Sequence, residues 1–280
     1  MKRTLLTLDE IHATLLDLLK YIDSFCREHS IRYSIAGGTL IGAIRHRGFI
    51  PWDDDADIMM PRPDYERFLE LFPKEAKGQY KVLNRNTEKH HLFVNCYAKI
   101  EDTSTISEER GVKAMTRFGL NIDLFPVDGA PDSPQEQKDV CRKVIFFKHR
   151  ITHSQKPFYH LFLPHQGAPM AFIQAHFHKV DYWLDECEKL LRERDFSTSS
   201  HAGALCGMYR EREVFERRVF EEYTDYEFEG VTLMGIKDAH TYLSGLYGDY
   251  MTPPPASQRR GKHHLKVYRK DNRESGKGAV

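Results

Sequence analysis

The segment Gly48–Met60 reads GFIPWDDDADIMM and holds four aspartates within five positions, at 53, 54, 55 and 57. Successive side chains of an extended strand point to opposite faces, so Asp53, Asp55 and Asp57 are predicted to share one face. Carboxylates this close repel one another, and burying them without partners is costly. Trp52 and the apolar run at 58–60 favour packing against a core over a solvated acidic turn. The segment therefore predicts a site for a divalent cation.

The ligand type narrows the choice of metal. Sites built from oxygen ligands alone suit magnesium, manganese or calcium, whereas zinc and copper prefer imidazole and thiolate. An EF-hand calcium loop starting at Asp53 would need glycine at its sixth position and glutamate at its twelfth. The sequence has Ile58 and Asp64 there, and Pro61 and Pro63 interrupt the helix that would follow. We therefore predict Mg²⁺, with Mn²⁺ as the alternative.

A candidate phosphate-binding turn lies upstream of the aspartates. Alternating apolar residues at 31, 33 and 35 predict a strand that runs into Gly37, Gly38 and Thr39, and a short helix follows. Glycines let a ligand approach the backbone, and free N–H groups at a helix N-terminus favour an anion. Arg45 and His46 are candidates to reach the same phosphates. A Gly-Gly pair is more often only a tight turn, and both basic residues have ordinary surface charge as their alternative interpretation.

A second acidic position comes from a later strand. Leu120, Ile122 and Leu124 alternate with Asn121, Asp123 and Phe125, which predicts that Asp123 lies among apolar neighbours. An acid placed this way usually has a cation or hydrogen-bond partners. We predict that Asp123 completes the metal site, and a structural salt bridge is the alternative. Lys99, on the predicted strand 92–100, either contacts substrate or is solvated.

The order of the predicted elements indicates an α+β fold in one compact unit. Residues 1–130 are predicted to form the catalytic core, a mixed sheet flanked by helices. Residues 131–258 are predicted to form a mainly helical part with a hairpin turning at Glu229-Gly230, packed on the core. Residues 259–280 are predicted to be a basic, partly disordered tail. The segment 150–170, rich in histidine and aromatic residues, is assigned no site.

Composition excludes several classes of protein. The 280 residues carry 41 lysines and arginines against 41 aspartates and glutamates, so no global charge favours nucleic acid. The five cysteines are scattered without a CxxC pair and are predicted to be reduced thiols. No apolar run approaches the length of a membrane span, and we expect a cytoplasmic protein. Peripheral contact with the inner face of a membrane stays open.

Residues 36–58, AGGTLIGAIRHRGFIPWDDDADI, closely resemble the signature of the LicD family. That family is named for phosphorylcholine transferases and is related to the fukutin group of glycan phosphotransferases. The segments 60–68 (MPRPDYERF), 122–129 (IDLFPVDG) and 246–250 (LYGDY) also look like family sequence. The resemblance thus extends over most of the chain.

The resemblance implies a nucleotidyltransferase-like fold of the polymerase-beta type. It implies Gly37-Gly38 as the phosphate motif and Asp55 and Asp57 as paired metal ligands, with Asp53 assisting. Asp123 falls where that fold places its third acid. The implied donor is CDP-choline or another CDP-alcohol, and CMP is the implied leaving group. The implied acceptor is a sugar hydroxyl of a cell-surface polysaccharide precursor, such as lipopolysaccharide or teichoic acid, whether lipid-linked or not.

Three other functions share part of these features. A nucleotidyltransferase acting on a small molecule would use the same glycines and aspartates but release pyrophosphate. A glycosyltransferase with a DxD motif would consume a nucleotide sugar, and its aspartates would normally lack the upstream Gly-Gly element. A non-catalytic, glycan-associated binder would have kept the fold without turnover.

Overall fold

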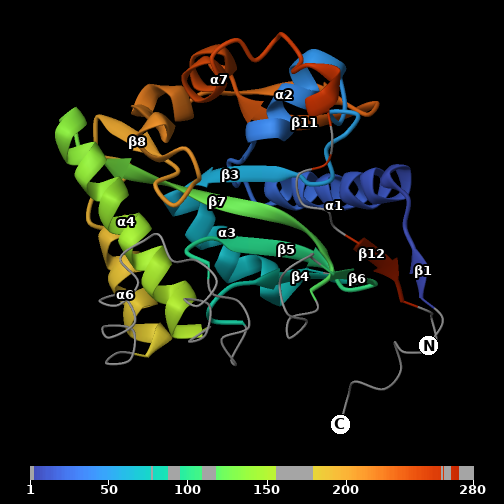
Figure 1. The fold of residues 1–280 in the computed structure, drawn as a ribbon, viewed down its shortest axis with the longest axis horizontal. Helices are drawn as coiled ribbons and strands as arrows, with labels where there is room; N and C mark the ends of the chain where they lie inside the picture. The colour runs from blue at the N-terminus through green and yellow to red at the C-terminus, as the bar shows by residue number, and fades with distance from the viewer. Residues whose placement is uncertain are drawn as a thin grey trace.

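A computed structural model describes residues 3–76, 78–87, 95–108, 118–155, 179–259, 261 and 266–270, with side chains between 118 and 155 described as far as 151. Its central sheet has the strand order β2-β3-β7-β5-β4 (Figure 1). The strand bounds are β2 Ser34–Ile35, β3 Asp57–Pro61, β4 Tyr80–Leu83, β5 Ala98–Asp102 and β7 Leu120–Ala130. β3 and β7 are parallel and the other pairs along this path are antiparallel. The predicted mixed α+β class is thereby confirmed.

Register within this sheet brings the predicted site residues together. Asp57 at the start of β3 lies opposite Asp123 of β7. Lys99 of β5 lies opposite Asp123 from the other side. Three neighbouring strands therefore each supply one charged side chain at the same level of the sheet.

Helices of the N-terminal half begin where local sequence predicts. α1 (Leu8–Glu28) has a complete capping box, in which the Thr7 side chain accepts from the Glu10 N–H and the Glu10 carboxylate accepts from the Thr7 N–H. α2 (Gly37–His46) follows β2 directly, and α3 (Arg62–Glu75) follows β3. The apolar face of α1 is buried in the same core as β3 and β7. These helices cover the sheet and fix the entry into β3.

The part from 131 to 258 contains strands as well as helices. α4 (Pro134–Gln155) and α6 (Val180–Leu191) pack against each other beside the sheet (Figure 1). β8 (His201–Gly203) pairs in antiparallel register with the end of β7, and β9 (Val214–Glu216) pairs with β8. Short 3₁₀ turns lie at Arg210–Glu213 (η2), Arg217–Phe220 (η3) and Ala256–Gln258 (η4). The prediction of a mainly helical second half is thus only partly correct.

The predicted hairpin forms and packs on the core. β10 (Tyr223–Phe228) and β11 (Val231–Ile236) pair in antiparallel register around the turn at Glu229-Gly230. The Met234 N–H donates to the Tyr33 hydroxyl at 3.1 Å, and the Ile236 N–H donates to the Ser34 hydroxyl at 2.9 Å. α7 (Ala239–Tyr247) follows the hairpin. The second half is therefore joined to β2, immediately before α2.

Part of the predicted basic tail is folded. β12 (Lys266–Arg269) lies between β1 (Thr4–Leu5) and β6 (Thr105–Glu108) in a three-stranded sheet. Val267 is fully buried there. Residues 271–280 lie outside the described residues, as does most of the segment 150–170. An ordered strand is compatible with the prediction of a partly disordered tail, and the sequence did not indicate β12 because its strand partners are distant.

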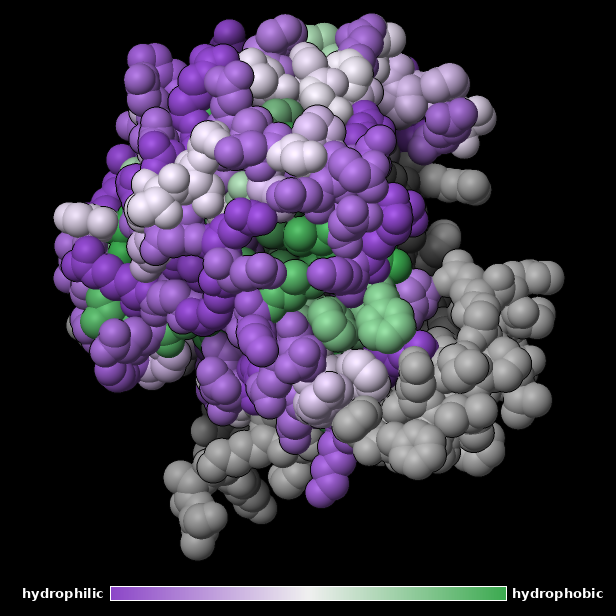
Figure 2. Space-filling model, turned by 90° about the vertical axis from the view of Figure 1, so that its left-hand side faces the viewer, coloured by the Kyte–Doolittle hydropathy of each residue, from purple (hydrophilic) through white to green (hydrophobic). Residues whose placement is uncertain are grey.

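The face that carries α4 and α6 is mostly hydrophilic, with an apolar hollow near its centre (Figure 2). A groove of about 280 Å³ lies between α4 and η2, lined by Lys138, Cys141, Arg142, Ile145, Arg210 and Glu211.

All five cysteines are free thiols, as predicted, although the Cys96 and Cys187 sulfurs approach to 3.1 Å. No helix among the described residues is long and apolar enough to cross a membrane.

A buried ion pair fastens α3 to β7. The Arg62 guanidinium donates from Nε and Nη2 to the Asp128 carboxylate at 2.6 and 2.9 Å, and Asp128 is 1% exposed. Burial raises the pKa of Asp128, and the adjacent Arg62 opposes that rise. The Glu188 carboxylate of α6 accepts from the same guanidinium at 3.2 Å. The pair thereby connects three elements around one buried charge.

We expect Asp128→Asn to lower the free energy of unfolding by about 3 kcal/mol, because the substitution leaves a buried guanidinium short of charge compensation. Urea denaturation followed by circular dichroism measures the change. Lys74→Ala is the matched control, because it removes only an exposed pair with Glu70, and it should leave the midpoint within measurement error. An Asp128→Asn midpoint as high as the control would contradict this role.

Candidate active site

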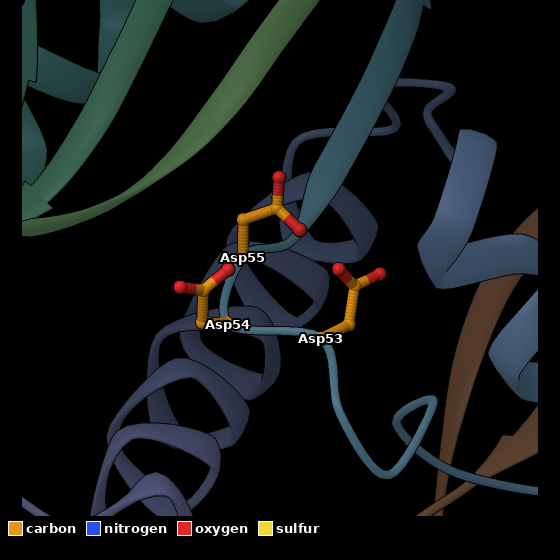
Figure 3. Close-up of side chains that lie close together, drawn as sticks. All are labelled: Asp53, Asp54 and Asp55. Atoms are coloured by element: carbon orange, nitrogen blue, oxygen red, sulfur yellow. The ribbon is translucent and has the colours of Figure 1, made fainter. Parts of the chain in front are cut away.

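Asp53, Asp54 and Asp55 project from the short segment that leads into β3 (Figure 3). The alternation predicted from the sequence is present, because Asp54 and Ala56 are buried while Asp53, Asp55 and Asp57 are partly accessible. The strand itself begins only at Asp57, so the first three aspartates lie in extended chain before it. One carboxylate oxygen from each of these three lies within 4.8 Å of the others.

Asp57 and Asp123 complete the carboxylate cluster. The Asp123 N–H donates to the Ala56 carbonyl at 3.1 Å, which holds β7 against the segment carrying the aspartates. Burial raises the pKa of Asp57 well above its usual range, and the charges of Asp55 and Asp123 raise it further. Asp53 adds to this effect and Lys99 opposes it. The four predicted carboxylates are therefore close enough to influence one another electrostatically.

Asp123 is held by two side chains of the neighbouring segment. Lys99 forms an ion pair with it and also donates to the Asn121 side-chain oxygen at 3.0 Å. The Tyr97 hydroxyl donates to Asp123 as well. Asp123 therefore forms the salt bridge that was the alternative interpretation, and its role as a metal ligand stays a prediction. Lys99 therefore has partners within the chain, and the prediction that it is simply solvated is wrong.

The glycines lie directly against the aspartates. Gly37 opens α2 with a φ of 50°, a left-handed conformation that favours glycine. A Cβ at Gly38 would lie 2.8 Å from Asp53 Oδ2, and one at Gly37 would lie 3.4 Å from Asp57 Oδ2. The Thr39 hydroxyl accepts from the Asp57 N–H at 2.9 Å. The first turn of α2 therefore lies against the carboxylate cluster.

Arg45 and His46 lie at the opposite end of α2. Arg45 comes eight positions after Gly37 in the helix, which is about 12 Å along the axis. Arg45 donates to the Tyr250 carbonyl at 2.7 Å and to His46 Nε2 at 2.9 Å. Burial lowers the pKa of Arg45, and the charge of Arg259 lowers it further. Burial also lowers the pKa of His46, and the charge of Arg45 adds to that effect. Their described contacts are with each other, with the Tyr250 carbonyl just after α7 and with the Trp52 ring, at the end of α2 away from the glycines.

Three tyrosines near the cluster were not predicted from sequence. The Tyr242 hydroxyl of α7 accepts from the Gly37 N–H, and the Tyr247 hydroxyl would lie 3.2 Å from a Cβ at Gly37. Tyr97 contacts Asp123, as described above. The segment 246–250 resembles family sequence, and that resemblance was the available signal for Tyr247. Periodicity alone could not place α7 over α2.

A buried glutamate supports the segment next to these tyrosines. The Tyr209 N–H donates to Glu213 Oε1 at 2.7 Å, and Glu213 is 6% exposed. Burial raises the pKa of Glu213 to about 7, and the backbone hydrogen bonds from Tyr209 and Met208 and the charge of Lys148 oppose the rise. This carboxyl group therefore changes its charge near neutral pH.

The donor set fits a hard divalent cation. All candidate ligands are carboxylate oxygens, the donor type that such ions prefer, and the charges of Asp55 and Asp123 add to the rise that burial causes in the pKa of Asp57. Asp54 is the most buried of the three clustered aspartates, and a Cβ at Gly261 would lie 3.1 Å from its Oδ2. Among the described residues, Asp54 Oδ1 is buried without a hydrogen-bond partner. Asp54 is therefore a further candidate ligand beside the four predicted from the sequence.

Comparison with known proteins agrees with this arrangement. Residues 30–177 match the family described as "LicD/FKTN/FKRP, nucleotidyltransferase domain". The chain is 30% identical to "Lipopolysaccharide cholinephosphotransferase LicD" of Haemophilus influenzae, over 94% of this chain and 98% of that protein. It is also 32% identical to an uncharacterized protein of Rickettsia typhi, over 35% of this chain and 30% of that protein.

The fold, the site and these similarities together define a phosphotransferase enzyme. More particularly, the chain belongs to the LicD/FKTN/FKRP family.

We expect Asp57→Asn to raise the melting temperature of the metal-free protein at neutral pH. The raised pKa of Asp57 means that its charged form is disfavoured in the folded state, so its contribution to stability falls as pH rises through the pKa of the unfolded chain. The neutral amide removes that cost. Mg²⁺ at 100 times its Kd should stabilise the folded wild type by about 2.7 kcal/mol. The same concentration should stabilise Asp57→Asn far less, because that variant lacks one of the proposed ligands.

Differential scanning calorimetry in chelator and in Mg²⁺ measures both effects. Asp17→Asn on the exposed surface of α1 is the control, and it should respond to Mg²⁺ like the wild type. Equal Mg²⁺ stabilisation of Asp57→Asn and wild type would contradict the assignment of Asp57 as a ligand.

Glu213 should make stability depend on pH. The folded pKa of about 7 exceeds the ordinary value of 4.5, so the folded state binds more protons and stability falls as pH rises between these values. We expect a loss on the order of 3 kcal/mol across that range. The Glu213→Gln variant should lose less unfolding free energy between pH 4.5 and 7.5 than the wild type does. Urea denaturation at these two pH values measures the loss. Identical pH dependence in both proteins would show that Glu213 is not the source.

Proposed function

We propose that the protein transfers phosphorylcholine, or another phospho-alcohol, from a CDP-activated donor to a sugar hydroxyl of a lipopolysaccharide precursor, releasing CMP. One observation carries the proposal: Asp53, Asp55, Asp57 and Asp123 gather beside the first turn of α2. The support for choline and lipopolysaccharide is the name of the Haemophilus influenzae relative, which this chain matches over almost its full length.

Asp55, Asp57 and Asp123, assisted by Asp53, are the proposed ligands of Mg²⁺, with Mn²⁺ as the alternative. When bound, the ion supplies positive charge that offsets the charge of the donor diphosphate and its leaving group. Lys99 lies next to Asp123 in the same layer of the sheet and neutralises part of that carboxylate before any substrate arrives. The parallel pairing of β3 with β7 keeps these groups in register.

The first turn of α2 is the proposed binding site for the donor phosphates. Amide groups at a helix N-terminus favour an anion, and Gly38 leaves the backbone open to close approach. Because the Gly37 N–H already donates to the Tyr242 hydroxyl, the Gly38 and Thr39 amides are the more suitable donors. Arg45 would have to leave its contact with the Tyr250 carbonyl to reach this turn. This layout supports a nucleotidyltransferase arrangement of the polymerase-beta type.

In the proposed reaction, the acceptor hydroxyl oxygen attacks the phosphorus atom that bears the choline. A new P–O bond forms to the sugar, and the P–O bond to CMP breaks in line with it. The hydroxyl proton passes to Asp53 or Asp123, the two acids that flank the paired ligands. We propose that this takes place in the cytoplasm, with contact at the inner face of the membrane where the acceptor is lipid-linked.

The test is an assay of the purified protein with Mg²⁺, a lipopolysaccharide acceptor and a panel of CDP-alcohols, with CMP as the measured product. We expect CMP release with CDP-choline or a related donor, and at least about a 100-fold loss of rate in Asp55→Asn and in Asp123→Asn. Asp17→Asn should keep full activity, and far-UV circular dichroism verifies that each variant is folded.

Two outcomes would contradict the proposal. Release of pyrophosphate from a nucleoside triphosphate, without CMP from any CDP-alcohol, would identify a nucleotidyltransferase of small molecules. Binding of glycan without turnover of any donor would identify a non-catalytic binder.

A further inference from the structure

Two tyrosines from separate elements meet beside the candidate active site. Tyr209 precedes η2 and Tyr247 ends α7, and their ring centroids lie 5.1 Å apart at an interplanar angle of 73°. Both side chains are partly accessible. The two rings meet edge to face, and their hydroxyl groups share a hydrogen bond. This pair is called the Tyr209–Tyr247 corner below.

This corner lies next to the carboxylate cluster. The Tyr247 hydroxyl and Asp57 Oδ2 are within 3.2 and 3.4 Å of the same point, the position of a Cβ at Gly37. A group bound against Tyr247 would therefore lie within a few ångströms of the acids assigned to the transfer. That separation suits the alcohol end of a donor whose phosphates lie at the first turn of α2.

Acidic side chains lie on both sides of the corner. The buried Glu213 accepts from the Tyr209 N–H, and Asp57 lies on the other side, next to Tyr247. Arg212 is also close, and it donates to the carbonyls of Gly245 (3.2 Å) and Leu246 at the end of α7. Its guanidinium carbon lies 6.0 Å from the Tyr209 ring centroid.

A second aromatic pair lies near the cluster. Tyr97 and Phe125 lie 4.5 Å apart, and the Lys99 ammonium is 5.8 Å from the Tyr97 ring centroid. Each pair thus has one basic side chain near a ring, Lys99 or Arg212. The Tyr209–Tyr247 corner is the better candidate because the Tyr247 hydroxyl lies beside Gly37, at the first turn of α2.

We propose that Tyr209 and Tyr247 form the binding subsite for the quaternary ammonium group of the donor. Aromatic rings attract such cations through the negative potential of their faces, without the hydrogen bonds that a nucleobase requires. The proposal rests on the proposed function, because it assigns the choline end of that donor. It makes the tyrosines determinants of donor specificity and leaves the catalytic role to the aspartates.

The test compares CDP-choline with its uncharged analogue, in which a 3,3-dimethylbutyl group replaces choline. We expect the wild type to have a KM for CDP-choline about tenfold below that for the analogue, because only the cation gains from the rings. Tyr209→Leu should raise the KM for CDP-choline about tenfold and make the two donors equivalent. Tyr209→Phe, which keeps the ring, should behave like the wild type.

Two controls separate the subsite from general damage. Tyr182→Leu removes a tyrosine that is 42% exposed on α6, and it should change neither KM. Inhibition by CMP, which lacks choline, should be the same in all variants. An equal rise in KM for both donors, or weaker CMP inhibition in Tyr209→Leu, would overturn the proposal, because the ring would then serve the nucleotide.

Calorimetric titration with free phosphorylcholine tests the subsite without turnover. Binding to the wild type and to Tyr209→Phe, with at least about tenfold weaker binding to Tyr209→Leu, supports the subsite even if no CDP-alcohol is turned over and the proposed function fails. Equal binding by all three proteins, or binding by none, would overturn the subsite and leave the proposed function to the CMP assay.

Discussion

Repulsion among carboxylates held at fixed backbone positions is the constraint on which the site depends. Pairing of β3 with β7 sets Asp57 opposite Asp123, and the chain leading into β3 adds Asp53 and Asp55. Asp57 and Asp123 cannot separate without breaking strand pairing, so their charge is met by cations or by protonation. Lys99 supplies one cation from within the sheet. The remaining negative charge is the basis of the proposal that a divalent ion binds here, and such an ion would in turn attract the phosphates of a substrate.

The second half of the chain contributes side chains to the candidate site. Hydrogen bonds from the hairpin to Tyr33 and Ser34 hold α7 over the first turn of α2. From there Tyr242 binds the Gly37 amide, and Tyr247 comes close to Asp57. The acids come from the N-terminal half and part of their surroundings from the C-terminal half. The candidate site therefore requires both halves, although the metal motif lies in only one of them.

Features that depend on near neighbours could be predicted from the sequence. The common face of Asp53, Asp55 and Asp57 follows from strand alternation, and the turn at Glu229-Gly230 follows from glycine between two strand patterns. Arg45 was associated with the glycines through proximity in sequence, but a helix carried it to the far end. Tyr247 depends on long-range packing, and no periodicity in α7 encodes that contact.

The strand β12 has a consequence for the biosynthesis of the protein. Its partners β1 and β6 come from the beginning and the middle of the chain, and each pairs with it rather than with the other. A translation product that stops short of Lys266 would leave both strands with open hydrogen-bonding edges. Such edges recruit strands from other molecules. Ribosome stalling near the 3′ end of the message would therefore yield chains that contain all four clustered aspartates yet tend to aggregate.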